Sequence, residues 1–146
     1  YDNVSLASMY FRWVGPGPLS VRLALGTAVL LLGLVALVFS GRRGIPFPEG
    51  IEGAMLLTLM PLLSPQGWHY VFLIATPAIV YLANYEDLLP RSLRVVTIVA
   101  VAAIGFSLFD LMGRAAYSTF MRLSIISLCF LVVLAALATL RLRKIA

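Results

Sequence analysis

The polar stretch from Ser64 to Tyr70 holds the residue types best suited to chemistry in this chain. It reads Ser-Pro-Gln-Gly-Trp-His-Tyr, contains the only histidine among 146 residues, and separates two strongly apolar runs. A polar break in an apolar chain is costly in lipid, so it is more often kept for binding or catalysis than for support. We therefore take Ser64, Gln66, Trp68, His69 and Tyr70 as candidate site residues.

Each of these side chains has a functional and a structural interpretation. His69 either faces a polar substrate as a hydrogen-bonding or proton-transfer group, or is an interfacial histidine beside aromatic anchors. Ser64 either binds a ligand or bonds to a carbonyl freed by the following proline, and Gln66 offers both a donor and an acceptor. Trp68 and Tyr70 either stack on a sugar or an isoprenoid chain, or anchor the chain at the interface. No second ligand stands at a suitable spacing from His69, so we expect no metal and no cofactor.

Composition places the chain in lipid. Hydrophobic residues make up 62% and charged residues 12%, and the mean hydropathy is +1.01, whereas soluble domains are roughly half apolar and about a quarter charged. We expect an all-α polytopic membrane protein. The net charge of +5 does not indicate a nucleic-acid partner, because the basic residues stand in small groups at the ends of apolar runs. The single cysteine, Cys129, lies in an apolar run and excludes a disulfide framework.

Hydropathy predicts five transmembrane helices after an N-terminal interfacial helix. Residues 2–14 are too short and polar to span, but Leu6, Met9, Tyr10 and Trp13 recur at helical spacing, which is typical of an amphipathic helix at the membrane surface. The chain forms one membrane domain over residues 1–146. The predicted transmembrane helices cover residues 19–40, 51–66, 68–85, 95–113 and 120–140.

The length of the second run, a proline in the third and a short segment after the fourth predict local structure. The apolar core of the second, residues 51–63, covers only about 20 Å as a helix, so we expect the Ser64–Tyr70 turn to lie below the membrane surface in a protein-lined cavity. Pro77 predicts a kink in the third helix. Residues 113–119 are expected to form a short turn.

The charged residues near these runs have mainly local interpretations. Asp110 and Arg114, four residues apart, suit a local ion pair; alternatively, Arg114 or Arg122 holds a phosphate that arrives from the lipid. Glu49 and Glu52 stand at the start of the second helix, where anions are favoured, and we assign them no chemistry.

The positive-inside rule favours a cytoplasmic C-terminus. That orientation places residues 3–13 and the Ser64–Tyr70 turn together on the extracytoplasmic side, which suggests one shared site there. The outer face would hold four basic residues, Arg12, Arg22, Arg114 and Arg122, and the inner face seven, Arg42, Arg43, Arg91, Arg94, Arg141, Arg143 and Lys144.

Two motifs resemble glycosyltransferase family 87. Residues 62–70, Leu-Leu-Ser-Pro-Gln-Gly-Trp-His-Tyr, resemble the late motif of that family, roughly Leu-Ser-Pro-x-Ser/Gly-Trp-Asp-His-His. Residues 3–6, Asn-Val-Ser-Leu, followed by Arg12, resemble its preceding Asn-Gln-Ser-Leu…Arg element. The resemblance covers residues 2–85 and adds Asn3, Ser5 and Arg12 to the candidate substrate-binding residues.

The chain departs from these motifs at a few positions. Val4 stands where the family has glutamine. In register, His69 takes the aspartate position and Tyr70 the first histidine position. His69 and Tyr70 therefore both remain candidates for the catalytic role of the family's histidine.

The resemblance implies the type C glycosyltransferase fold and an activity. Enzymes of this family transfer a sugar, often mannose, from a polyprenyl-phosphate donor to an extracytoplasmic lipid or glycan acceptor. It also implies a bacterial plasma membrane location, surrounding membrane lipids, and a catalytic carboxylate in an early extracytoplasmic loop that this chain lacks. Because the chain begins at Tyr1 and not at methionine, we expect a C-terminal fragment that is inactive alone. The alternatives are a transporter or flippase with a broken-helix site, and a non-catalytic membrane scaffold.

Overall fold

The computed structural model describes residues 3–41, 48–65, 73–107 and 109–143, and every regular element in these ranges is a helix. The all-helical prediction is confirmed. A short 3₁₀ turn, Glu86–Leu88, follows the fourth helix. The α-helices are α1 (Leu6–Val14), α2 (Pro18–Ser40), α3 (Pro48–Leu63), α4 (Thr76–Tyr85), α5 (Arg91–Phe106), α6 (Phe109–Arg122) and α7 (Ile125–Leu142).

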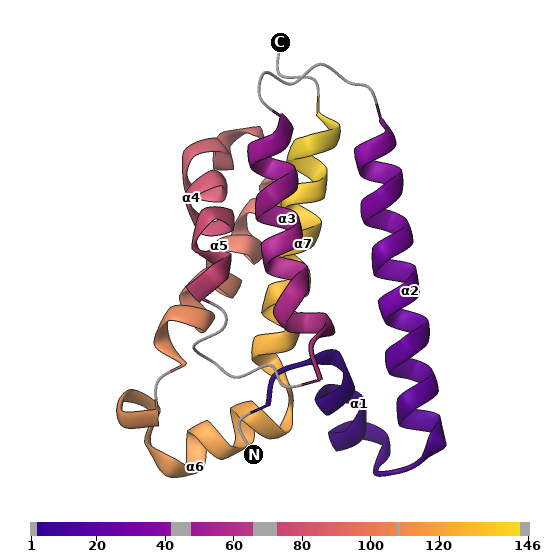
Figure 1. Cartoon of the computed structure of the whole chain (residues 1–146). Coiled ribbons are helices and arrows are strands. Elements are labelled where there is room, and N and C mark those ends of the chain that lie inside the picture. The colour runs from indigo at the N-terminus through magenta and orange to yellow at the C-terminus, as the bar shows by residue number, and fades with distance from the viewer. Residues whose placement is uncertain (1–2, 42–47, 66–72, 108, 144–146) are drawn as a thin grey trace.

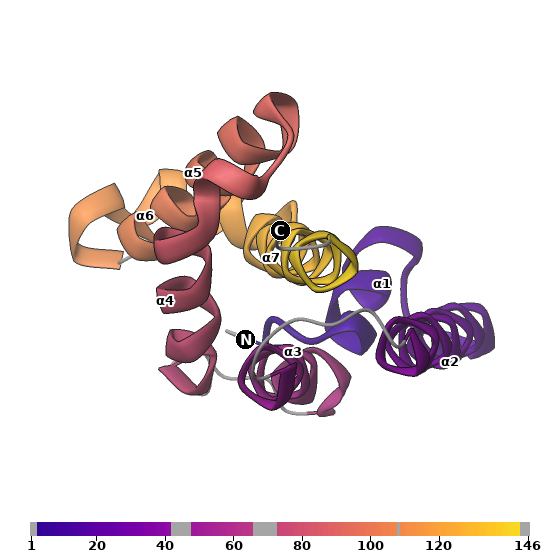
Figure 2. The same cartoon turned by 90° about the horizontal axis from the view of Figure 1, so that it is seen from above.

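Helix α7 is the central column of the molecule. It packs against α5, α3, α4 and α6, whereas α2 lies at the periphery (Figure 1, Figure 2). In the most apolar 18-residue window of α7, 56% of the residues are buried, against 11% in α2. The main core contains Val133, Leu134 and Leu137 of α7 together with Met55 and Leu59 of α3. The apolar surface of α7 is therefore used to join other helices.

Two of the described helices are long and apolar enough to cross a membrane. Helix α2 has 23 residues, helix α7 has 18, and the most apolar window of each has a mean hydropathy of 2.5. At 1.5 Å per residue they are about 35 and 27 Å long. Helices α3 and α5 have 16 residues each and α4 has 10. Five crossings therefore stay a prediction, while the all-helical architecture and two helices of membrane-spanning length are observed.

Helix α2 leaves most of its apolar surface uncovered. Leu25, Val29, Leu30 and Leu37 are each more than half exposed, and Leu37 reaches 69%. Large contiguous apolar surfaces of this kind are found where a protein meets lipid or another protein segment.

The third predicted helix begins later in the structure than the hydropathy suggested. Part of the predicted range, residues 68–72, lies outside the described residues, and α4 begins at Thr76. Pro77 is therefore in the first turn of α4, where its missing N–H has no intrahelical partner to lose. The predicted kink at Pro77 is wrong for this reason.

Helix α6 corrects the expected turn at residues 113–119. Helix α5 ends at Phe106, and the chain is helical again on both sides of a break at Gly113, whose φ is +74°. Tyr117, Phe120 and Met121 of α6 pack on a hydrophobic cluster while the opposite face is exposed. An amphipathic helix of low mean hydropathy is easily taken for a turn when the search is for apolar spans.

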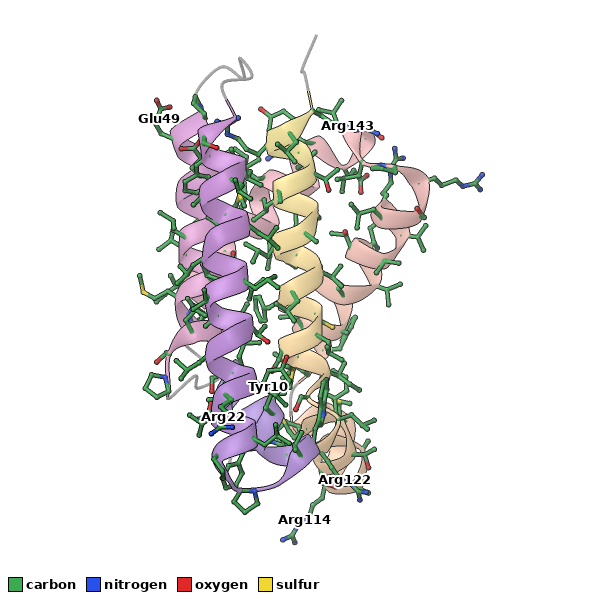
Figure 3. All side chains as sticks on the ribbon, turned by 90° about the vertical axis from the view of Figure 1, so that its right-hand side faces the viewer. Tyr10, Arg22, Glu49, Arg114, Arg122 and Arg143 are labelled. Atoms are coloured by element: carbon green, nitrogen blue, oxygen red, sulfur yellow. The ribbon has the colours of Figure 1, made fainter. Side chains whose placement is uncertain are left out.

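Charged side chains gather at the two ends of the molecule. Arg22, Arg114 and Arg122 lie at the end that holds α1 and α6, which we call the α1 end, and Glu49 and Arg143 lie at the other, which we call the C-terminal end (Figure 3). This separation leaves an apolar middle along the long helices, as the positions of the basic residues in the sequence predicted.

An ion pair ties α3 to α7 at the C-terminal end. The Nε and Nη2 atoms of Arg141 each lie 2.8 Å from Oε1 of Glu52. The side chains are 5% and 24% exposed, so water screens this pair little. Glu52, to which the sequence assigned no chemistry, thus has a structural role in holding two core helices together.

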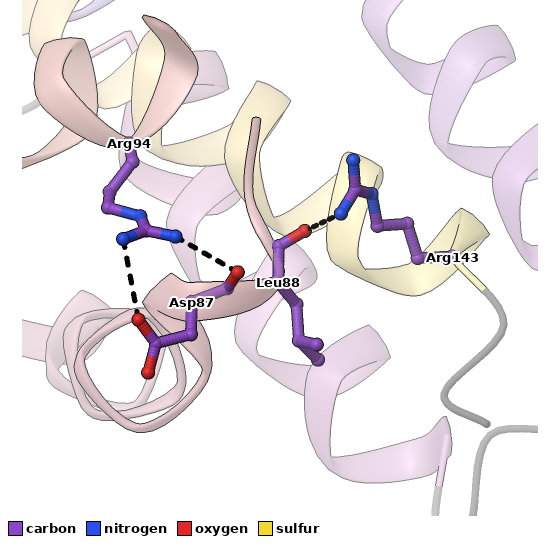
Figure 4. A network of polar contacts seen from close by, with 4 residues as sticks. All are labelled: Asp87, Leu88, Arg94 and Arg143. Atoms are coloured by element: carbon purple, nitrogen blue, oxygen red, sulfur yellow. Dashed lines mark hydrogen bonds and ion pairs between the residues drawn. The ribbon is translucent and has the colours of Figure 1, made fainter. Parts of the chain in front are cut away.

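The same end contains a second polar contact between distant segments. Arg94 of α5 lies 3.4 Å from the Asp87 carboxylate and donates to the Asp87 carbonyl at 3.0 Å. Arg143, just after α7, donates to the Leu88 carbonyl (Figure 4). The turn between α4 and α5 is therefore bonded to both α5 and the end of α7.

We expect the Glu52–Arg141 pair to be required for stability. Glu52→Ala leaves a nearly buried guanidinium without its carboxylate and should lower the free energy of unfolding by about 3 kcal/mol. Glu49→Ala, one turn earlier in the same helix at an exposed position, should change it by less than about 0.5 kcal/mol. Thermal unfolding of both variants in detergent measures the difference. Equal unfolding temperatures would contradict a stabilising role for the pair.

Candidate functional site

A polar network at the α1 end contains three of the candidate residues named from the sequence. We call it the α1 network; it consists of Asn3, Ser5, Ser8, Arg12, Ser124 and Ser127 with the backbone groups that they bind. It joins the segment before α1, the helix α1 itself, and the junction between α6 and α7.

Ser5 and Asn3 begin helix α1. Ser5 is fully buried and has extended backbone angles, and its hydroxyl accepts a hydrogen bond from the Ser8 N–H at 3.3 Å. This is a helix N-cap, which explains why α1 starts at Leu6 and not at residue 2 as predicted. The Asn3 side-chain carbonyl accepts from the Ser5 N–H at 3.0 Å. The first turn of α1 is thus fixed by its two preceding polar side chains.

The Arg12 guanidinium binds three separate parts of the chain. Its Nη1 donates to the Met121 carbonyl at 2.6 Å and to the Ser124 hydroxyl at 3.0 Å. Its Nη2 donates to the Ser8 hydroxyl at 2.8 Å and to the Asn3 carbonyl. The planar fork of arginine suits such convergent acceptors better than the single ammonium of a lysine. Arg12 therefore fastens α1 to the α6–α7 junction, 109 residues away.

Ser124 lies at the sharp turn between α6 and α7. Its φ is +56°, the only positive φ at a non-glycine residue among those described, and its N–H bonds to the Met121 carbonyl at 3.0 Å. A left-handed conformation costs a non-glycine residue about 1–2 kcal/mol. The Arg12 donors on the Ser124 hydroxyl and the Met121 carbonyl help to stabilise this backbone.

Ser127 and an apolar cluster connect the α1 network to the core of the molecule. The Ser127 hydroxyl donates to the Val4 carbonyl at 2.6 Å, and both residues are at most 1% exposed. Beneath the network, a second core brings α1, the end of α3 and the start of α7 together. Its buried members are Val4, Leu6, Met9, Leu62, Ala75, Met121, Ile126 and Phe130.

Asn3 also reaches the start of the Ser64–Tyr70 turn. Its side-chain N–H donates to the Pro65 carbonyl at 2.8 Å, across 62 residues of sequence. Ser64 lies beside it, with its N–H bonded to the Met60 carbonyl at 3.0 Å as a continuation of α3. The structure therefore brings the Asn3–Arg12 segment and the beginning of the Ser64–Tyr70 turn to the same place.

The other predicted members of the site are not among the residues that the structure describes. Gln66, Trp68, His69 and Tyr70 fall in the gap between residues 65 and 73. Their roles stay predictions, as does their contact with a substrate. What the structure adds is the position of Pro65, which is bonded to Asn3.

Sequence reasoning missed the serines of the network. Ser8 precedes Arg12 by four residues, which is one helical turn, so their contact was open to prediction from spacing. Ser124 and Ser127 are small polar residues near the start of an apolar run, where a polar group needs a partner. Their partners, Arg12 and the Val4 carbonyl, lie more than a hundred residues away and cannot be found from spacing.

Aromatic side chains of α1 lie beside the network. The Tyr10 hydroxyl is 2.7 Å from the Thr27 hydroxyl of α2, and the Tyr10 and Trp13 rings meet edge to face with centroids 6.2 Å apart. Phe11 and Trp13 are about half exposed. An exposed aromatic face on a short helix at one end of the molecule is typical of a position at the membrane interface.

The described polar groups of the α1 network mainly hold backbone segments in place. Asn3, Ser5 and Arg12 all bond to groups of the chain itself. Within the described ranges no three His, Cys, Asp or Glu side chains form a group able to hold a metal. Arg114 and Arg122 are exposed at this end (Figure 3), and the side chain of Asp110 is not described, so the Asp110–Arg114 pair stays a prediction.

Comparison of the chain with models of protein families, with curated proteins and with solved structures finds no match. The geometry of the α1 network and the sequence motifs are therefore the basis for a functional proposal.

We expect Arg12 to be required for the α6–α7 junction. Arg12→Gln removes most of the donors that bind Met121, Ser124 and Asn3, so it should lower the unfolding free energy by about 2–3 kcal/mol. Hydrogen exchange of the amides near Ser124 should speed up as well. Arg22→Gln removes an exposed arginine at the same end and serves as the control. If both variants exchange at the same rate as the unmodified protein, the Arg12 contacts are not stabilising.

Proposed function

We propose that this chain is part of an integral membrane glycosyltransferase. It would transfer a sugar, for which mannose is our first candidate, from a polyprenyl-phosphate donor to an extracytoplasmic lipid or glycan acceptor. The proposal comes from the resemblance of residues 3–12 and 62–70 to glycosyltransferase family 87. One structural observation supports it: Asn3 in the first motif bonds to Pro65 in the second.

This contact matters because the two motifs are independent in the sequence. Helix α2 and most of α3 separate them. If the motifs were accidental, nothing would require their ends to meet. Their meeting at one end of the helix bundle is what a shared site for a lipid-linked substrate needs, because the donor phosphate lies at the membrane surface.

The proposed reaction breaks the bond between the sugar anomeric carbon and the donor phosphate oxygen. An acceptor hydroxyl oxygen forms the new bond to that carbon, its proton goes to a base, and polyprenyl phosphate leaves with the electron pair. The base would be the carboxylate that the resemblance places in another part of the full protein. His69 or Tyr70 would hydrogen-bond to the phosphate or to the acceptor, and Trp68 would stack on the sugar or the isoprenoid.

In this proposal the α1 network positions the second motif and does not bind the sugar itself. Asn3 would hold the Pro65 carbonyl, and Arg12 would hold Asn3 through its backbone carbonyl. Both residues would then influence transfer by placing the turn that follows Pro65. Because rate depends steeply on the positions of reacting groups, a shift of about 1 Å is enough to cost about a hundredfold.

We expect sugar transfer by the full-length protein to depend on the second motif. In membranes supplied with radiolabelled polyprenyl-phosphate mannose, His69→Ala or Tyr70→Phe should reduce transfer by about 100-fold, and Asn3→Ala about tenfold through loss of positioning. Asn84→Ala changes an exposed asparagine whose side-chain N–H donates to the Val80 carbonyl within α4 and should leave transfer unchanged. Full transfer by both His69→Ala and Tyr70→Phe at normal expression would remove the proposed site.

We also propose that the α1 end faces the extracytoplasmic side and the C-terminal end the cytoplasm, following the distribution of basic residues. With Cys129 replaced by alanine, Arg114→Cys should react with a membrane-impermeant maleimide in intact cells. Glu49→Cys should react only after the cells are permeabilised. Both positions are exposed at opposite ends of the molecule (Figure 3). The reverse pattern would place the candidate site in the cytoplasm and end the proposal.

A further inference from the structure

Three exposed arginines surround the α1 end of the molecule, and we call them the arginine rim. They are Arg22 of α2 and Arg114 and Arg122 of α6 (Figure 3). None of the three has a hydrogen bond or an ion pair with the residues that the structure describes. At the C-terminal end, by contrast, Arg94 and Arg141 are paired with carboxylates. The arginine rim therefore carries charge that no described group neutralises.

The α1 end keeps a positive excess when every ionisable group near it is counted. The arginine rim and Arg12 supply four positive charges. Asp2, which lies outside the described residues, and Asp110, whose side chain is not described, supply at most two negative charges, so at least two positive ones remain. The only histidine of the chain is neutral or positive and cannot reverse this sign. The other acidic residues all belong to the C-terminal end: Glu49, Glu52, Glu86 and Asp87. An anionic partner therefore suits the α1 end.

Arg22 lies at the level where a bilayer changes from acyl chains to headgroups. The part of α2 from Arg22 to Ser40 is about 27 Å long, close to the thickness of the hydrocarbon layer, about 30 Å. The side chains around Arg22 are apolar and exposed: Leu19, Val21, Leu23 and Leu25. A guanidinium among lipid-facing side chains extends toward the membrane surface. When α2 spans the membrane, Arg22 is therefore within reach of lipid phosphates.

Arg114 and Arg122 both lie on the exposed face of α6. They are about 12 Å apart along the helix, with Ser118 midway between them. The opposite face of α6 packs on the hydrophobic cluster at the α1 end, and the helix lies across the end of α7 (Figure 1). An amphipathic helix in this orientation lies along the membrane surface, where basic residues on its polar face attract anionic lipids.

We propose that the arginine rim binds the phosphate groups of anionic phospholipids in the leaflet around the α1 end. Guanidinium groups donate paired hydrogen bonds to phosphate oxygens, and the exposed Phe11 and Trp13 of α1 contact the lipids beside them. A zwitterionic lipid suits this end less, because its own cationic group would lie in the same positive field. The apolar neighbours of Arg22 favour a lipid over a soluble anion. The proposal rests on the membrane location and is independent of sugar transfer.

Photo-crosslinking of the full-length protein in proteoliposomes tests the proposal. A benzophenone amino acid takes the place of Leu19, one turn before Arg22, or of Ser118, between Arg114 and Arg122. The membrane contains equal amounts of phosphatidylglycerol and phosphatidylcholine, and mass spectrometry identifies the captured lipids. We expect phosphatidylglycerol to exceed phosphatidylcholine about fivefold at each probe.

Substitutions in the arginine rim separate its charges from the rest of the surface. Arg22→Gln should bring the two lipids to equal capture at position 19, and Arg114→Gln combined with Arg122→Gln should do the same at position 118. Arg22→Lys should keep most of the excess at position 19, because the positive charge remains. Arg91→Gln removes an exposed arginine at the C-terminal end and should leave capture at both probes unchanged.

Several results would overturn the proposal. They are equal capture of the two lipids with all three arginines present, an excess of phosphatidylglycerol that persists in the glutamine variants, and crosslinks to a second copy of the chain in place of lipid. Displacement of phosphatidylglycerol by a small amount of polyprenyl phosphate would also overturn it, since the arginines would then belong to the sugar-donor site. If a glutamine variant does not fold, salt dependence decides, because the excess should fall toward equal capture at high salt. Sugar transfer is not measured here, so either proposal can fail without the other.

Discussion

The Arg12 guanidinium is the interaction on which the α1 end depends. The segment before α1 and the turn from α6 to α7 meet there, and each has a backbone carbonyl that needs a donor. Arg12 supplies donors to the carbonyls of Asn3 and Met121 and to the hydroxyls of Ser8 and Ser124. Ser5 and Ser124 are at most 1% exposed, so water has little access to replace these donors. One side chain therefore couples the folding of residues near both ends of the chain.

The corresponding contact at the other end is the ion pair of Arg141 with Glu52, and together they fix α7 at both of its ends. Such polar contacts matter more for helix packing in lipid than in water. Lipid tails are as apolar as leucine side chains, so the hydrophobic effect does not drive helices together there. Apolar packing between α3 and α7 tolerates sliding and rotation. The polar contacts are specific in direction and distance, so we expect them to favour one register of α7 against its neighbours.

Some of this architecture was predictable from local signals in the sequence, and some was not. The bounds of α2, residues 18–40 against a predicted 19–40, follow from the prolines and glycines on both sides. The sequence predicted a turn within α6, because this helix is amphipathic and its mean hydropathy is low. The Glu52–Arg141 pair and the contacts of Arg12 join residues 89 and 109 positions apart. A single sequence contains local periodicity but no record of which distant residues meet. Arg12 was assigned to substrate binding by resemblance, and the structure gives its guanidinium a bonding role within the chain.

The hydrogen-bonding state of a polar side chain helps to separate structural residues from ligand-binding ones. Polar groups of the α1 network bond to backbone or to one another, so their presence is explained by folding alone, and the network argues for function only through the segment that it positions after Pro65. Arg94 Nε and the Thr97 hydroxyl differ from these groups, because neither has a hydrogen-bond partner among the described residues although burial makes that costly.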